Sequence, residues 1–475
     1  MLHRRGNQTL VVELTSTYER IKVRIKKLTL VNNNLEMVPE ELEVEEVKQN
    51  NEKKSDKQKV SFIIESFLHR TLDIEECAKH FIHSAYKSNK DKYHHLLEEI
   101  SANQKTLENE VDKNVRLLTT KSLSKNLREI ERESKSNLPE TLEKSLFNNL
   151  FANFDKYIGD LVTVLYENCP NLYKNLNREV KLSTVLTYES LDDLREEILN
   201  DEIETLRRKS YVEQFKDLQN KFSITLTKFE DWPLFVESAQ RRNLFTHCDG
   251  IVSKQYLDIC SEVGYKHKNE VGDQLKIGAK YFFQSSMVIS EVAVMLAQTL
   301  WRKTLPDQIE EADNHLSSLI FDYLHMEQWG KAICLSKFAL NLPNISSETN
   351  ERLFRVNYAI ALNAIGQDKA AKNVLDKKDW SATTYDFKLA YAVVTKNYEE
   401  AMKFMIKIGL EGEYITELSY HDWPLFRDFR DREEFLSGYE KVYGYKYSSK
   451  LSEIAEDKKA NVDEILTSSI DDESS

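Results

Sequence analysis

The sequence has little glycine and proline and lacks paired cysteines. It contains 12 Gly and 7 Pro among 475 residues, which is too little punctuation for a loop-rich β fold and favours long helices. The five cysteines are odd in number and scattered, and none belongs to a Cys-x-x-Cys pair. A disulfide framework and a zinc knuckle are therefore not expected, and a reducing, cytoplasmic compartment is predicted.

Long apolar runs are also missing. The longest, residues 287–300, is broken by Ser290, Glu291 and Gln298, so it is too short for a membrane span and is typical of a buried helix. The N-terminus is basic but no apolar segment follows it, which argues against a signal peptide. A net charge of −13 argues against a generally basic nucleic-acid-binding protein, although it permits a local basic site.

Residues 1–138 are predicted to form a mainly helical N-terminal region. Val, Ile, Thr and Leu partly alternate over residues 9–31, which favours a small β-hairpin. Residues 40–59 are dominated by Glu, Lys, Asn and Gln and predict a solvated linker. The charged stretch 90–137 carries only a thin apolar stripe and predicts a long helical hairpin.

The histidines of this region raise the possibility of a metal site. His80 and His83 have an i, i+3 spacing that can chelate a metal ion on one helix face. No acidic or cysteine partner completes a familiar ligand set, so solvated helix histidines are the simpler interpretation. No metal and no other cofactor is predicted.

A helical bundle is predicted over residues 139–306. In "LFNNLFANFDKYIGDLVTVLYEN" the apolar residues recur at spacings of four and three, which makes one stripe on a long helix. An acidic helix over 189–219, a helix entered at Trp232 and the apolar segment 277–301 follow. Four such helices with short to medium connections are typical of a bundle. The stripe consists of Phe147, Phe151, Phe154, Ile158, Leu161 and Leu165.

Residues 307–445 resemble tetratricopeptide (TPR) repeats. Three helical pairs follow one another, and their second helices begin near "EQWGKAICLSKFAL", "IGQDKAAKNVL" and "KNYEEAMKFMI". The aligned alanines Ala332, Ala370 and Ala401 lie 38 and 31 residues apart, close to the TPR period of about 34. A small residue there lets two helices cross closely. The array and a closing helix predict a binding surface for a protein or peptide partner, and the acidic tail 446–475 is predicted to be disordered.

The stretch "RRNLFTHCDG" at 241–250 carries the residues best suited to chemistry. RNA is cleaved without a metal when its own 2′-hydroxyl attacks the neighbouring phosphorus. That reaction needs a proton-transfer group with a pKa near ~6.5, which histidine supplies, and a cation over the developing charge, which arginine supplies through a bidentate fork. Asn243 shares a helix face with His247, four residues on.

The spacing of Arg242 and His247 constrains how they act together. They are five residues apart, about 140° around a regular helix. They converge only if the helix ends near His247, as Asp249 and Gly250 predict, or if two copies of the chain face each other. Because no second comparable motif occurs in the chain, a paired site requires a homodimer.

Residues 145–305 resemble a HEPN domain, a helical bundle whose ribonuclease members carry an Arg-x(4–6)-His motif. Arg242, Asn243 and His247 match it as R-N-x-x-x-H, and "LFNNLFANF" and "DGIV" are also similar. The resemblance implies a metal-independent endoribonuclease that acts on RNA as a homodimer, with these three residues as the catalytic group. Together with the repeats it is similar to regulated toxins and anti-phage defence effectors. Further phosphate contacts are predicted for Arg241, Arg207, Arg208 and Lys209.

Other interpretations remain open. Arg241 and Arg242 also fit surface charges near a helix C-terminus, where the helix dipole favours them, with His247 as a cap. Arg207, Arg208 and Lys209 also fit a solvated face. The alternative function is a non-catalytic scaffold, in which the bundle dimerises and the repeats bind a protein. A third option is a nucleotidyl-transfer target in a toxin–antitoxin pair.

Overall fold

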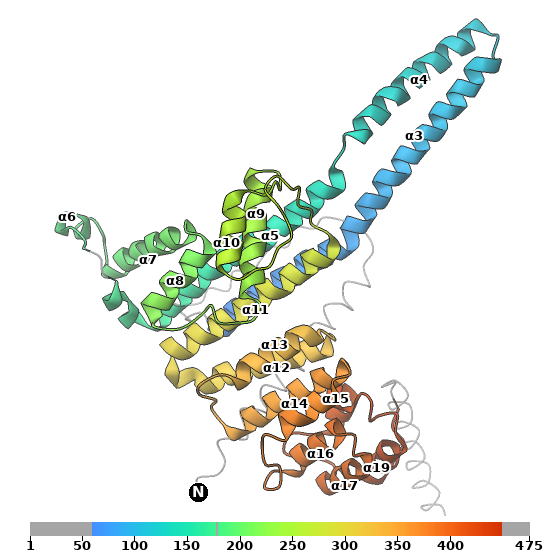
Figure 1. The fold of residues 1–475 in the computed structure, drawn as a ribbon. Coiled ribbons are helices and arrows are strands. Elements are labelled where there is room, and N and C mark those ends of the chain that lie inside the picture. Colours follow the sequence, from blue (N-terminus) through green and yellow to red (C-terminus); the bar gives the residue numbers. More distant parts are fainter. Residues whose placement is uncertain (1–58, 177–178, 449–475) are drawn as a thin grey trace, which may run out of the picture. The chain divides into compact units, whose positions relative to one another are not determined.

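The computed structural model describes residues 59–176 and 179–448, and every regular element in these ranges is a helix (Figure 1). The all-α prediction is confirmed for this part of the chain. The β-hairpin predicted over 9–31, most of the linker at 40–59 and the tail from 449 onward lie outside the described residues.

The first helices form a long antiparallel hairpin. α2 (Val60–Cys77) continues through a π-helical turn (Ala78–Ile82) into α3 (His83–Asn109), which pairs with α4 (Lys113–Ser134), as the charged pattern predicted (Figure 1). Asp112 starts α4 by accepting hydrogen bonds from the backbone N–H groups of Asn114 and Val115, which satisfies donors that a helix start leaves free.

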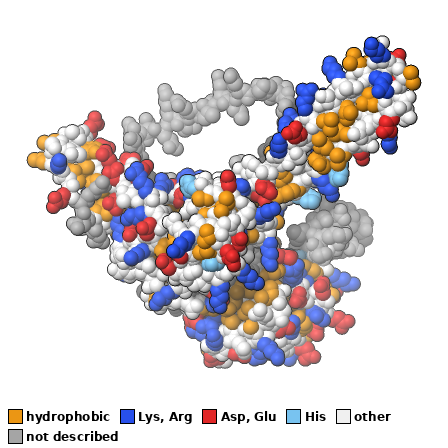
Figure 2. Space-filling model, turned by 45° about the horizontal axis from the view of Figure 1, so that its top comes forward, with side chains coloured by type: hydrophobic (Ala, Val, Ile, Leu, Met, Phe, Trp, Pro, Cys, Tyr) orange, Lys and Arg blue, Asp and Glu red, His pale blue; other side chains and the backbone are white. Residues whose placement is uncertain are grey.

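The hairpin buries little of its apolar surface. Leu96 and Ile100 are the hydrophobic residues of α3 that are buried. Orange side chains lie along the hairpin in the space-filling view (Figure 2). The strongly exposed apolar residues there are Val111, Leu117, Leu118 and Leu127. These two helices are therefore held mainly by each other.

A bundle of four helices forms the central core. α5 (Leu138–Asn168) packs against α2, α9 (Trp232–His247) and α11 (Ala279–Thr304), and α11 also contacts α2 and α9. The predicted apolar stripe of α5 is buried throughout, and the Tyr157 hydroxyl donates to the Ala293 carbonyl of α11 at 2.7 Å. The prediction of one acidic helix over 189–219 is wrong, because Ser210 caps the start of a new helix and divides the stretch into two. The fourth helix of the core is α2 instead, which comes from the predicted N-terminal region. The remaining helices of this part are α6 (Leu182–Val185), α7 (Leu191–Arg207), α8 (Tyr211–Phe222) and α10 (Lys254–Glu262).

The apolar segment 287–300 lies inside α11, where it is buried in the bundle as predicted. Among the residues that the structure describes, we find no helix with an apolar stretch sufficient to cross a membrane. Two of the three polar residues that interrupt the segment, Ser290 and Gln298, form hydrogen bonds within the protein. Ser290, for example, donates its hydroxyl to the Ser286 carbonyl one turn earlier, so this buried polar group is satisfied.

Three consecutive helical pairs follow the bundle (Figure 1). Within each pair the helices pack together, and the first helices also contact one another in succession, the arrangement of a stacked array. Ala332 and Ala401 are fully buried, whereas Ala371 rather than the half-buried Ala370 takes the buried place in the second pair. The elements are α12 (Ile309–His325), α13 (Trp329–Leu340), α14 (Glu348–Ala364), α15 (Asp368–Leu375), α16 (Tyr385–Val394), α17 (Tyr398–Ile408), α18 (Glu417–Asp422) and α19 (Glu433–Tyr443).

His315 joins the array to the bundle and predicts an acid-sensitive junction. Its side chain is 7% exposed, its Nδ1 lies 3.4 Å from Gln298 Nε2, and burial lowers its pKa to about 4. The unfolded chain binds a proton at this histidine below pH ~6.5 while the folded chain does not. We therefore expect the free energy of unfolding to fall by up to ~3 kcal/mol as the pH drops from about 6.5 to about 4. The Glu65 carboxylate, 3.7 Å from Nε2, favours the protonated imidazole and reduces this loss.

Urea unfolding of the wild type and of His315→Gln across this pH range tests the prediction. The variant should show a smaller loss of stability between pH 6.5 and 4, whatever its stability at pH 7. The exposed His95, replaced by Gln, is the matched control and should keep the wild-type profile. Identical pH profiles for the wild type and His315→Gln would contradict the prediction.

Candidate functional site

The candidate site is built around the end of α9, which carries the Arg242 to His247 motif. The helix ends at His247, as Asp249 and Gly250 predicted, because the Leu244 carbonyl accepts from the N–H groups of Cys248 and Gly250 at 2.7 and 3.0 Å. Asp249 and Gly250 have positive φ angles of 50° and 82°, which turn the chain away from the helix axis. A Cβ at Gly250 would lie 2.5 Å from the Phe245 ring.

Arg242 lies beside Asp155, a residue of α5. Its Nη2 is 3.5 Å from Asp155 Oδ2, and its Nη1 donates to Asn243 Oδ1 at 3.1 Å. The Arg242 side chain is 27% exposed, so part of the guanidinium reaches solvent. The catalytic Arg and Asn predicted from the motif are thus in contact with each other.

Arg207 reaches the same carboxylate region from α7. Its Nε donates to the Asp155 carbonyl at 3.1 Å, and its Nη2 lies 3.4 Å from the Lys156 carbonyl. Asp155 therefore has two arginines near it, which come from helices far apart in the sequence. Of the four predicted phosphate contacts, Arg207 is the one that the structure brings to Arg242.

Asp155 is held by a third partner, which the sequence interpretation missed. The Tyr211 hydroxyl of α8 donates to Asp155 Oδ1 at 2.5 Å. Burial raises the pKa of Asp155, while this hydrogen bond and the charges of Arg242 and Arg207 oppose the rise. The Asp155 carboxylate therefore fixes the position of the Arg242 guanidinium and occupies part of its N–H donors.

Arg241 points into the protein instead. Its Nε donates to Glu237 Oε1 at 2.7 Å, and its guanidinium lies 3.8 Å from the centre of the Tyr281 ring. The hydroxyls of Tyr256 and Tyr281 donate to the two oxygens of Glu237 at 2.6 and 2.5 Å. Glu237 is fully buried. Arg241 therefore belongs to an internal network, and its side chain is only 12% exposed.

The other predicted contacts lie apart from this cluster. The exposed Arg208 pairs with Glu204 at 3.0 Å, and Lys209 pairs with Asp217. His247 is exposed at the end of α9, and we find no hydrogen bond or ion pair between its imidazole and another described residue. Because α9 is helical through His247, the five-residue spacing places the imidazole and Arg242 on different sides of the helix.

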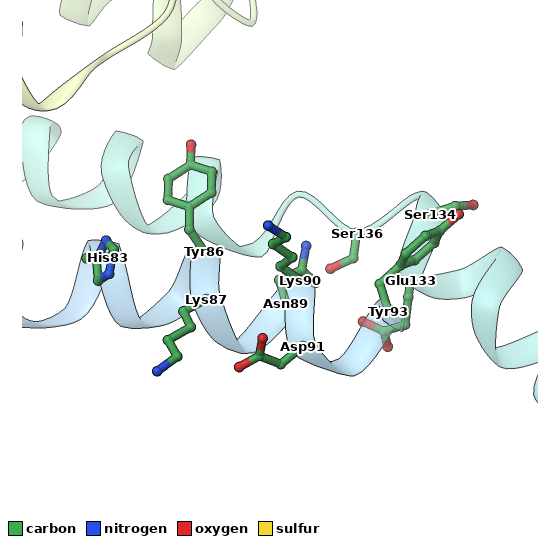
Figure 3. Close-up of a pocket in the computed structure, with 10 residues that line it drawn as sticks. All are labelled: His83, Tyr86, Lys87, Asn89, Lys90, Asp91, Tyr93, Glu133, Ser134 and Ser136. Carbon is green, nitrogen blue, oxygen red and sulfur yellow. The ribbon is translucent and has the colours of Figure 1, made fainter. Parts of the chain in front are cut away.

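A separate hollow of about 840 Å³ lies between α3 and the connection from α4 to α5. Tyr86 and Lys87 point to opposite sides of α3, so the lining side chains do not converge on one point (Figure 3). None of the motif residues lines it. The hollow offers no constellation for catalysis.

No protein-family model, no curated protein and no solved structure was found that matches this chain.

Proposed function

We propose that this chain is a metal-independent endoribonuclease of the HEPN type, with Arg242, Asn243 and His247 as its catalytic residues. The observation that carries the proposal is the end of α9, where a partly exposed Arg242, joined by Arg207, stands close to the helix terminus that presents His247. A histidine and a cation are the groups that phosphate cleavage by an internal hydroxyl requires, and Arg207 adds a second positive charge.

The reaction follows from these roles. The 2′-hydroxyl attacks phosphorus while His247 accepts its proton, the bond from phosphorus to the 5′-oxygen breaks, and that oxygen takes a proton from water. His247 then gives its proton to solvent. Arg242 stabilises the charge on the non-bridging oxygens, because a guanidinium has five N–H donors and Asp155 occupies only part of them. The products are a 2′,3′-cyclic phosphate and a 5′-hydroxyl.

The test is incubation of the purified protein with total RNA in EDTA, beside His247→Ala protein. The proposal expects cleavage by the wild type alone and fragments whose 3′ ends carry a cyclic phosphate. Cleavage that disappears in EDTA and returns with a divalent ion, equally in both proteins, would contradict it.

A homodimer is part of the proposal. Arg242 and His247 of one chain lie on different sides of α9, so a two-fold axis beside this helix is needed to bring the arginine of one protomer to the histidine of the other. Light scattering should give twice the 55.6 kDa chain mass. Mixing Arg242→Ala with His247→Ala protein should restore part of the activity, since half of the mixed sites then contain both residues. A monomer with full activity would refute the shared site.

A non-catalytic scaffold is the second candidate. It is favoured by the fact that Arg241, Arg242 and Arg207 all contact groups of the protein already, as structural arginines do. In this alternative the bundle dimerises and the stacked helical pairs, which resemble TPR repeats, bind a protein or peptide. It predicts intact RNA in the EDTA assay and a partner that is lost when residues 307–445 are removed.

A further inference from the structure

A second cluster of polar side chains lies at the opposite end of α9, where that helix begins. Asp231 is the N-cap residue of α9, Glu291 lies within α11 and Cys334 within α13. One carboxylate oxygen from each acid and the cysteine Sγ all lie within 4.8 Å of one another. Three segments far apart in the sequence thus direct metal-binding atoms to one point.

Glu291 is the most deeply buried acid of this cluster, and the Cys334 thiol is a hydrogen-bonding partner of its carboxyl group. The Glu291 side chain is 3% exposed, and its Oε2 atom has no hydrogen-bond partner among the residues that the structure describes. A buried carboxylate oxygen without a partner is unfavourable. A buried acid that keeps one oxygen unpartnered and lies beside two other possible ligands is an arrangement that a bound cation would satisfy.

The nearby basic side chains do not fill this role. Lys331 Nζ lies 3.5 Å from Glu75, and Lys337 pairs with Glu230 at 2.6 Å. Neither Asp231 nor Glu291 forms an ion pair with a basic side chain within residues 59–176 and 179–448. Without a cation, burial and the charge of Asp231 raise the pKa of Glu291 to about 8.

The donor atoms select the kind of cation. Hard ions such as Mg²⁺ and Ca²⁺ prefer oxygen ligands alone, whereas Zn²⁺ accepts a thiolate together with carboxylates. Because the three ligand atoms lie within 4.8 Å of one another, an ion placed between them would be no more than about 2.8 Å from each atom. Zn²⁺ ligands stand at about 2.0–2.3 Å, so a small inward movement of the side chains completes the site.

We propose that Asp231, Glu291 and Cys334 bind a Zn²⁺ ion that fastens the start of α9 to α11 and α13. Water supplies the fourth ligand of a tetrahedral site. Binding releases the thiol proton of Cys334 and the carboxyl proton of Glu291 to solvent and leaves both groups anionic. The ion joins the helix that carries Arg242 to the first helical pair of the repeat array, and its binding does not depend on the ribonuclease activity proposed above.

The experiment uses the full chain after treatment with a chelator and transfer to metal-free buffer. Titration with Co²⁺ should produce a thiolate-to-cobalt charge-transfer band that reaches its maximum at one ion per chain and is removed by Zn²⁺. Cys334→Ser should lack this band, and Glu291→Gln and Asp231→Asn should weaken Co²⁺ binding at least tenfold. Cys248→Ser removes an exposed thiol and is the matched control that should keep the band.

Thermal unfolding gives a second reading that does not depend on spectroscopy. Zn²⁺ should raise the melting temperature of the wild type by several degrees. Metal-free Glu291→Gln should be about as stable as the metal-free wild type, because the amide has nearly the shape of the neutral carboxyl group, yet it should not respond to Zn²⁺. No charge-transfer band in the wild type, a band that survives in Cys334→Ser, or an equal Zn²⁺ response in Glu291→Gln would overturn the proposal.

Discussion

Arg242→Ala and His247→Ala are each expected to lower the rate of RNA cleavage by ~10²–10⁴-fold, since each removes either charge stabilisation or proton transfer in the transition state. Arg242→Lys should recover little of this loss, because an ammonium keeps the charge but cannot form the bidentate fork to phosphate. The measurement is the initial rate of cleavage of a labelled RNA in EDTA, together with the circular dichroism spectrum of each variant.

The matched control is Arg208→Ala. Arg208 is strongly exposed and pairs with Glu204, so its loss should leave the cleavage rate close to that of the wild type. The cleavage rate of Arg207→Ala should lie between those of Arg242→Ala and Arg208→Ala. Arg207 is hydrogen-bonded to backbone carbonyls beside Asp155, so it adds positive charge to the site although it is not one of the motif residues. Full activity in a folded Arg242→Ala protein would remove that residue from the mechanism.

The helices were predictable because their signals are local. The stripe of α5 repeats every three or four residues, and the end of α9 is marked by Asp249 and Gly250 within the next turn. The three second helices of the repeat array also follow from neighbouring residues. Such patterns need no knowledge of distant segments, so periodicity and capping were enough to place them.

The partners in the site could not be predicted in the same way. Asp155, Arg207 and Arg242 meet through the packing of α5, α7 and α9, and nothing in the sequence links those positions. The cluster of Asp231, Glu291 and Cys334 likewise depends on three helices.

One local signal was available and separates Arg241 from Arg242. Glu237 lies four residues before Arg241, the spacing at which a glutamate and an arginine pair on one helix face. Arg242 has no acid at that spacing, since Ser238 lies there. The neighbouring arginines therefore face different surroundings, one the interior network and the other Asp155 and solvent.

Glu237→Ala is expected to destabilise the fold by ~3–5 kcal/mol, because removing one partner of a buried ion pair leaves the other charge uncompensated. Glu237 is fully buried and accepts from Arg241, Tyr256 and Tyr281. Its loss removes the acceptor of the Tyr256 hydroxyl and leaves the nearly buried Arg241 guanidinium without its counter-charge, and each group left unsatisfied adds to the cost. Urea unfolding at pH 7, followed by circular dichroism, measures the change.

Two further variants decide whether the cost arises from the broken network. Glu204→Ala removes an exposed glutamate from its pair with Arg208 and should change stability by no more than ~0.5 kcal/mol. The double variant Glu237→Leu/Arg241→Met removes both buried charges and should recover a large part of the stability lost in Glu237→Ala, since an apolar pair of similar size needs no compensation. If Glu237→Ala unfolds at the same urea concentration as Glu204→Ala, the network around Arg241 does not stabilise the bundle.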